Sequence, residues 1–148
     1  MISNFEELEK LFEEIDKSIS EKARLYVIGG VVLLHQGIKE ATKDIDAVVG
    51  REVEFVAIQN ALKRLKFEVK IPTLEYRKTD LSQIFVRGDF RIDLFHRTVC
   101  KGFYLSEAMK RRAKRVIEAK YLMISLCSNE DVFLFKTFTE REGDLTDC

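Results

Sequence analysis

The sequence predicts an α/β (α+β) fold in which helices flank a small mixed β-sheet. Three observations predict it. Apolar residues recur at helical spacing in some segments, form short buried runs in the segments between them, and flank a two-residue Gly-Asp loop that joins two predicted strands. The chain has 148 residues and no linker, repeat or low-complexity tract, so we expect one domain over residues 1–148.

The helices are predicted from one apolar face and from signals at their ends. In the helix over residues 4–20, apolar residues recur every three or four positions, and Ser3 or Asn4 can cap its start. Val31–Gln36 is a short helix closed by Gly37. In a helix over Val53–Leu65, the stripe expected in or beside the core comprises Val53, Val56, Ala57, Asn60, Ala61 and Leu65. Further helices are expected over Leu105–Ala113 and from Ser128 or Asn129 to about Glu140.

The strands are predicted from short apolar runs bounded by turn residues. Leu25–Ile28 stops at Gly29-Gly30, and Asp44–Val49 begins with polar residues before it becomes apolar. Phe67–Ile71 is followed by the only proline of the chain. A further strand is expected within Arg115–Leu126.

The two strands joined by the Gly-Asp loop are the clearest local feature. Gln83–Arg87 and Phe90–His96 flank Gly88-Asp89, which is typical of a tight hairpin. We expect one arm of this hairpin to lie near the strand that contains Asp44. In the second arm, one predicted face carries Arg91, Asp93 and Phe95, and the other carries Ile92 and Leu94.

Charge and cysteine content narrow the function classes. The chain has 25 basic and 25 acidic residues, so only a local patch could bind nucleic acid; residues 110–115 (Lys-Arg-Arg-Ala-Lys-Arg) are such a patch, with a solvated face as the alternative. Cys100, Cys127 and Cys148 lack metal-type spacing, and His96 with Cys100 is too few ligands for zinc. Without a membrane-length apolar run or a signal peptide, we expect a cytoplasmic protein with no membrane partner.

Two aspartates open the second predicted strand. Because side chains alternate along a strand, Asp44 and Asp46 project from the same face. Two carboxylates on one face of an apolar strand are costly unless a cation lies between them. Mg²⁺ is the natural candidate, since it takes carboxylate oxygens together with substrate phosphates. Capping or plain surface exposure at the strand start is the alternative.

A glycine pair and a third aspartate complete the pattern. Gly29 and Gly30 allow close backbone approach and leave amide groups free at a helix start, which suits a phosphate group. Asp93 lies on a separate strand, where an ion pair with Arg91 or a nearby lysine is the alternative reading. Three carboxylates from two strands beside such a turn describe a magnesium–nucleotide site.

The order of these residues resembles the nucleotidyltransferase superfamily, the polymerase-beta-like transferases. The resemblance rests on Gly29-Gly30, on Thr42-x-Asp44-x-Asp46 and on Asp93. It implies a nucleotidyltransferase-like small mixed sheet and covers most of the chain. Where many members carry a hydroxyl residue after the glycines, this chain has Val31, so one hydrogen bond to phosphate is not expected.

The C-terminal segment is similar to a motif of the abortive-infection type toxins and their relatives. Those proteins have a lysine on a helix followed by an Arg/Lys-Asp-x-x-Asp run, and this chain has Lys136 followed by Arg141, Asp144 and Asp147. Relatives continue with more helix, whereas Cys148 directly follows Asp147. A truncated C-terminus and an absent lid are both open, and either would weaken substrate binding while leaving the metal site.

The resemblance implies two-metal nucleotidyl transfer. Asp44 and Asp46 would hold Mg²⁺ against the triphosphate, and Asp93 would share the second metal and help deprotonate an acceptor hydroxyl. The backbone of Gly29 and Gly30 would bind the β- and γ-phosphates. Lys136 would neutralise the triphosphate, while Asp144 and Asp147 would either fix Lys136 and Arg141 or line the acceptor side.

Three candidates keep open alternatives. Thr42 is a nucleotide-binding candidate, with a turn hydroxyl as the other reading. His35, at the end of a short apolar helix, is read as a partly buried or capping residue rather than a catalytic one. Lys136 is either a site residue or a solvated lysine on an apolar helix.

Two functions therefore compete. The first is a magnesium-dependent enzyme that moves a nucleoside monophosphate from a triphosphate such as ATP to a hydroxyl on RNA or tRNA, a protein or a small molecule. The second is an inactive module with the same fold that binds a partner, for example an antitoxin in a toxin–antitoxin pair. The intact set of Asp44, Asp46 and Asp93 favours the enzyme.

Overall fold

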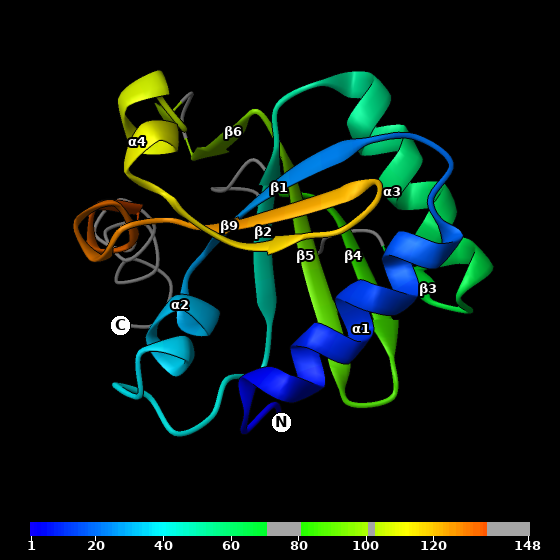
Figure 1. The fold of residues 1–148 in the computed structure, drawn as a ribbon, viewed down its shortest axis with the longest axis horizontal. Coiled ribbons are helices and arrows are strands. Elements are labelled where there is room, and N and C mark those ends of the chain that lie inside the picture. The colour runs from blue at the N-terminus through cyan, green and yellow to red at the C-terminus, as the bar shows by residue number, and fades with distance from the viewer. Residues whose placement is uncertain (71–80, 101–102, 136–148) are drawn as a thin grey trace.

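The structure is a computed structural model that describes residues 1–70, 81–100 and 103–135. Figure 1 shows a mixed β-sheet at its centre. Its seven strands have the order β3-β4-β5-β2-β1-β9-β8, so β2 is the middle strand. β2 pairs with β5, and β1 with β9, in parallel, and the other neighbours are antiparallel. The sheet strands are β1 (Ala23–Ile28), β2 (Ile45–Val49), β3 (Glu68–Lys70), β4 (Leu81–Arg87), β5 (Phe90–His96), β8 (Lys114–Glu118) and β9 (Leu122–Leu126).

Helices flank this sheet, which confirms the predicted fold class. A separate pair of short antiparallel strands, β6 (Thr98–Cys100) and β7 (Phe103–Tyr104), leads into the last named helix. The helices are α1 (Phe5–Ser18), α2 (Gly30–His35), α3 (Glu52–Arg64) and α4 (Glu107–Arg112), and residues 129–135 are also helical.

Helix α1 forms as its sequence predicts. The side chain of Asn4 caps it by accepting a hydrogen bond from the backbone N–H of Glu7 at 3.0 Å. Asp16, near its other end, accepts hydrogen bonds from the backbone N–H groups of Tyr121 and Leu122 at 2.8 and 2.9 Å. These bonds tie the helix to the start of β9. Its apolar face buries Leu8, Leu11, Phe12 and Ile15.

The hairpin formed by β4 and β5 confirms the prediction from Gly88-Asp89, and β5 lies directly beside β2. Both predicted faces of β5 are buried, because Asp93 and Phe95 on one face are covered as well as Ile92 and Leu94 on the other. A strand inside the sheet with both faces covered loses the simple alternation of an edge strand.

The buried stripe predicted for α3 was wrong in part. Ala57 and Ala61 are buried, but Asn60 is exposed and Val53 and Val56 keep 44% and 43% of their surface. The helix is rotated about its axis relative to the expected stripe, because the larger side chains of Phe55, Ile58 and Leu62 occupy the core.

Two further segments differ from the predictions. The region Arg115–Leu126 holds two antiparallel strands, β8 and β9, where one was expected. Asp44 precedes β2 rather than belonging to it. In the part of the chain that the structure describes, none of the helices combines the length and the hydrophobicity of a membrane span.

Candidate active site

The pairing of β2 with β5 brings two of the predicted aspartates side by side. The register of these parallel strands sets Asp46 directly opposite Asp93, and Asp44 lies just before β2. One carboxylate oxygen from each of these three residues lies within 4.8 Å of the other two. The structure therefore gathers the predicted triad into one cluster that could hold a metal ion.

The charges of this cluster disfavour one another. Burial raises the pKa of Asp46 well above its usual value, and the neighbouring charges of Asp93 and Asp44 raise it further. Burial also raises the pKa of Asp93, against the lowering effect of Arg91. A hydrogen bond links the carboxyl groups of Asp46 and Asp93. Among the described residues, the carboxylates of the cluster therefore outnumber the cations in contact with them, which is the situation that a divalent cation relieves.

Arg91 provides the cationic charge that the structure places at the cluster. Its Nε and Nη2 atoms donate hydrogen bonds to the two carboxylate oxygens of Asp93 at 2.8 and 3.2 Å, and its Nε lies 3.6 Å from Asp44. The alternative considered for Asp93, an ion pair with Arg91, is therefore present. Because one guanidinium faces three carboxylates, the ion pair does not remove the excess charge.

The glycine pair abuts the same cluster. Gly29 has φ +83°, and a Cβ there would lie 2.6 Å from Oδ2 of Asp46. A Cβ on Gly30 would overlap the hydroxyl of Thr42 and lie 3.2 Å from Nζ of Lys39. Both positions therefore require glycine for close approach to the site. Whether their amides bind phosphate stays a prediction.

Thr42 acts as a turn residue in the structure. It is buried, its hydroxyl donates to the carbonyl of Asp44 at 3.4 Å, and its backbone pairs with Ile2. This contact holds the chain just before Asp44, so Thr42 shapes the site whether or not it also touches a nucleotide. Val31, the departure from the family pattern, is fully buried beside the glycine pair.

Residues 6–148 match the family DUF6036, described as a nucleotidyltransferase of unknown function. The chain belongs to this nucleotidyltransferase family. It is therefore assigned to a class of enzymes, and the expected superfamily is confirmed. No curated protein sequence matches this nucleotidyltransferase.

Two solved structures resemble this nucleotidyltransferase in fold. One is a candidate nucleotidyltransferase from Thermotoga maritima, with 16% sequence identity, a TM-score of 0.66, and coverage of 99% of this chain and 92% of the other. The second is ANT(2″)-Ia in complex with adenylyl-2″-tobramycin, with 15% identity, a TM-score of 0.52, and coverage of 86% and 75%. At these identities the likeness concerns the fold.

Two residues considered in the sequence of this nucleotidyltransferase, His35 and Cys127, have packing roles in the structure. The ring of His35 packs edge-on against Phe5 with centroids 4.6 Å apart, in agreement with a packing role. Cys127 is buried, and burial raises its pKa to about 12, so its thiol is not a nucleophile near neutral pH. The other site candidates, Lys136, Arg141, Asp144 and Asp147, lie outside the described residues.

Two cationic residues near the carboxylate cluster, Arg91 and Lys39, were not predicted from the sequence as site residues. Arg91 was considered only as a partner of Asp93, although its position two residues before Asp93 already put both on one face. Lys39 gave no signal, because a lysine in a polar loop is ordinarily solvated; only the fold brings its ammonium beside Gly30.

Proposed function

We propose that this protein is a magnesium-dependent nucleotidyltransferase that moves a nucleoside monophosphate from a nucleoside triphosphate to a hydroxyl group. One observation carries the proposal: the carboxylates of Asp44, Asp46 and Asp93 lie within 4.8 Å of one another, beside a glycine turn. Membership of a nucleotidyltransferase family supports it.

The donor set fits magnesium. The three residues offer only carboxylate oxygens, the ligands that hard divalent cations prefer, and their charges are under-compensated. Asp44 and Asp46 would hold the ion, and Asp93 would share a second one. Bound Mg²⁺ would neutralise charge on the phosphates and lower the pKa of a hydroxyl oxygen next to it.

The reaction forms a bond between the acceptor oxygen and the α-phosphorus and breaks the bond from that phosphorus to the bridging oxygen, so pyrophosphate leaves. Asp93 would accept the proton of the acceptor hydroxyl, a role supported by its position opposite Asp46 in the pairing of β2 with β5. The backbones of Gly29 and Gly30 would bind the triphosphate, with Lys136 as its cationic partner. The ligand of ANT(2″)-Ia, adenylyl-2″-tobramycin, carries an adenylyl group and is consistent with this reaction class.

The experiment uses triphosphates labelled at the α-phosphate, MgCl₂, and extracts of RNA, protein and small molecules as acceptors. Asp46→Asn is the test variant, and Asp89→Asn in the exposed hairpin turn is the matched control. We expect label transfer by the native chain and by the control only. Transfer that survives in Asp46→Asn would contradict the proposed roles.

The partner and the location of the protein in the cell stay predictions. An antitoxin partner rests on the resemblance of the C-terminal segment, and a cytoplasmic location rests on sequence composition. Co-purification of a tagged chain from its native host would test the partner. Recovery of label only in the absence of that partner would support a toxin–antitoxin relationship.

A further inference from the structure

We infer that the acceptor is a nucleic acid, bound by its phosphate backbone along a basic groove on the same sheet face as Asp46. This inference rests on the proposed function, whose acceptor it identifies. The groove is made by two cavities of about 600 and 610 Å³ that share the residues Arg24, Arg51, Glu54 and Met123. It is called the basic groove below.

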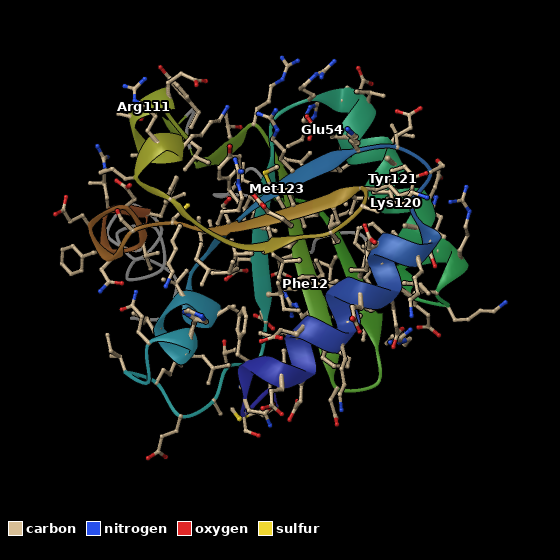
Figure 2. The ribbon with its side chains drawn as sticks, in the orientation of Figure 1. Phe12, Glu54, Arg111, Lys120, Tyr121 and Met123 are labelled. Carbon is tan, nitrogen blue, oxygen red and sulfur yellow. The ribbon has the colours of Figure 1, made fainter. Side chains whose placement is uncertain are left out.

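The sheet and the two helices α3 and α4 enclose the basic groove. In Figure 2, Met123 on β9 lies between Arg111 on α4 and Glu54 in the first turn of α3. Lys120 and Tyr121 mark the end of the groove at the turn between β8 and β9. The floor is therefore the exposed surface of the sheet, and the two helices stand at its sides.

Positive charge dominates the basic groove although the chain as a whole is neutral. Its acidic residues are all engaged: Glu54 accepts a hydrogen bond from the backbone N–H of Arg24 at 2.6 Å, Glu107 pairs with Lys110, and Glu118 pairs with Arg115. Within the described part of the chain, the guanidinium groups of Arg24, Arg51 and Arg111 form no ion pair. The cations that line the groove are Lys22, Arg24, Arg51, Lys110, Arg111, Arg115 and Lys120.

The basic run of residues 110–115 is divided by the fold. Arg112 turns away from the groove to bind Asp131, whereas Lys110, Arg111 and Arg115 line it. The sequence alone left a solvated face and a phosphate contact open. The division favours the phosphate contact, because distant residues such as Arg24 and Arg51 join the same groove.

The strand register connects the basic groove to the carboxylate cluster. Asp46 and Val48 project from the same face of β2, about 7 Å apart along the strand. Val48 lies opposite Tyr26 of β1, and both line a third cavity of about 630 Å³ that shares Tyr26 and Lys110 with the groove. A chain lying in the groove could therefore place its end near the triad.

The third cavity supplies aromatic surface as well as charge. Tyr26 and Tyr104 both line it, Tyr104 is 61% exposed, and Nζ of Lys110 lies 5.9 Å from the centre of the Tyr26 ring. Aromatic rings next to a cationic track suit bases and phosphates together. A polynucleotide also ends in a sugar hydroxyl, the group that the proposed reaction consumes. These features favour a nucleic acid over an acidic protein.

The test measures binding without catalysis. A 5′-fluorescein-labelled 20-nucleotide single-stranded RNA, and DNA of the same sequence, are titrated with the full chain in EDTA at 50–300 mM NaCl, with fluorescence anisotropy as readout. The test variant is Arg24→Glu/Arg111→Glu, and the control is Lys10→Glu/Lys70→Glu on exposed surface outside the groove. Arg24→Gln/Arg111→Gln is a milder second variant, and thermal melts verify that each variant folds.

We expect the affinity of the native chain to fall with salt, with a slope of roughly −2 to −4 in log–log form, since each phosphate contact to a single strand contributes about −0.7. The Gln variant should reduce that slope by about 1.4, and the Glu variant should weaken binding at least tenfold, while the control stays within about twofold. Binding of either nucleic acid with this pattern supports the inference.

Equal binding by groove and control variants would overturn it, as would the absence of binding or displacement of the RNA by polyglutamate at equal charge concentration. Binding of a fluorescent triphosphate with Mg²⁺, measured on the same variants, separates the two proposals. Groove variants should retain triphosphate binding. Groove-dependent RNA binding without any nucleotidyl transfer would reject the proposed function and leave the groove as a nucleic-acid site.

Discussion

Two buried aspartates in this molecule are each held by an arginine, yet their environments have opposite electrostatic results. Arg91 donates to both oxygens of Asp93 at 2.8 and 3.2 Å, and Arg112 donates to both oxygens of Asp131 at 3.1 and 2.7 Å. The carboxylate side chains are 7% and 3% exposed. The pKa of Asp93 is nevertheless raised, whereas the pKa of Asp131 is lowered.

The difference lies in the number of carboxylates that share one guanidinium. Among the described residues, Arg112 forms its ion pair with Asp131, and the hydroxyl of Ser128 adds a hydrogen bond to this carboxylate at 2.8 Å, so the ionised form of Asp131 is favoured. Arg91 faces Asp93 and also lies 3.6 Å from Asp44, next to Asp46. One contact is a balanced structural ion pair that fixes α4 to the helical residues 129–135, and the other leaves negative charge for a cation to balance.

The largest expected effect is on catalysis. Asp93→Asn removes the proposed metal ligand and proton acceptor, so we expect nucleotidyl transfer to fall by at least about 1000-fold. Asp131→Asn removes an equally buried carboxylate but should leave the rate within about threefold at temperatures where the variant is folded. Initial rates with a labelled triphosphate measure both. A comparable loss in the two variants would show that burial, rather than the cluster, accounts for the effect.

The second expected effect is stabilisation by metal. A ligand that binds only the folded state at 100 times its Kd stabilises it by about 2.7 kcal/mol, which for this length raises Tm by roughly 5–10 °C. We expect MgCl₂ to do this for the native chain and for Asp131→Asn, and to have little effect on Asp46→Asn. Melting curves over a MgCl₂ series, with NaCl adjusted to equal ionic strength, measure it. An equal rise in Asp46→Asn would place the metal elsewhere.

The contrast between these two aspartates also marks what the sequence could predict. The face of Asp46 could be predicted because strand alternation is a local property, and Asp93 followed from the hairpin. Asp44 joins them in the cluster although it precedes β2. The ion pair between Arg112 and Asp131 joins residues 19 positions apart, and no local pattern encodes it. The basic run of residues 110–115 therefore looked uniform in sequence, although the fold gives Arg112 a structural role and Arg111 a place in the basic groove.

Other misses have the same cause. The exposed valines of α3 were predicted to lie in or beside the core because a helical stripe can be drawn through Val53 and Val56 as well as through Phe55 and Ile58. Only packing against the sheet chooses between the two stripes. In contrast, the glycine pair stands out in the sequence, and the structure gives a steric reason for glycine there: side chains would collide with Asp46 and Thr42. The binding of phosphate by these glycines stays a prediction.

A third, smaller effect concerns the structural pair. Asp131→Asn removes the charge that Arg112 and Ser128 bind, so we expect Tm to fall by roughly 3–6 °C at pH 7. Because the pKa of Asp131 is lowered in the fold, its stabilising contribution is present above about pH 4 and is lost as pH falls through the folded pKa. The difference in Tm between Asp131→Asn and the native chain should therefore disappear in acid. The double variant Arg112→Gln/Asp131→Asn should be no less stable than Asp131→Asn alone. If its loss of stability instead equals the sum of the losses in the two single variants, the pairing of Arg112 with Asp131 is contradicted.

The smallest effect has the opposite sign and belongs to the metal-free cluster. Asp46 and Asp93 have raised folded pKa values, so the folded state binds more protons than the unfolded state above about pH 4. Stability that is fully present below pH 4 is then lost as pH rises through the folded pKa values. Asp46→Asn removes one of the repelling charges. In EDTA at pH 7 we therefore expect this variant to be more stable than the native chain by about 1 kcal/mol.

Urea unfolding from pH 4 to 8 in EDTA measures this difference, with Asp89→Asn as the exposed control. As pH rises from 4 to 8, the free energy of unfolding of the native chain should fall progressively relative to that of Asp46→Asn. The control should show the same pH dependence as the native chain. A variant that is inactive yet more stable without metal would mean that the cluster is kept for its chemistry at a cost in folding stability. If Asp46→Asn is instead less stable at every pH, the hydrogen bond between Asp46 and Asp93 outweighs their repulsion, and the cluster resembles the Asp131 pair more than its geometry indicates.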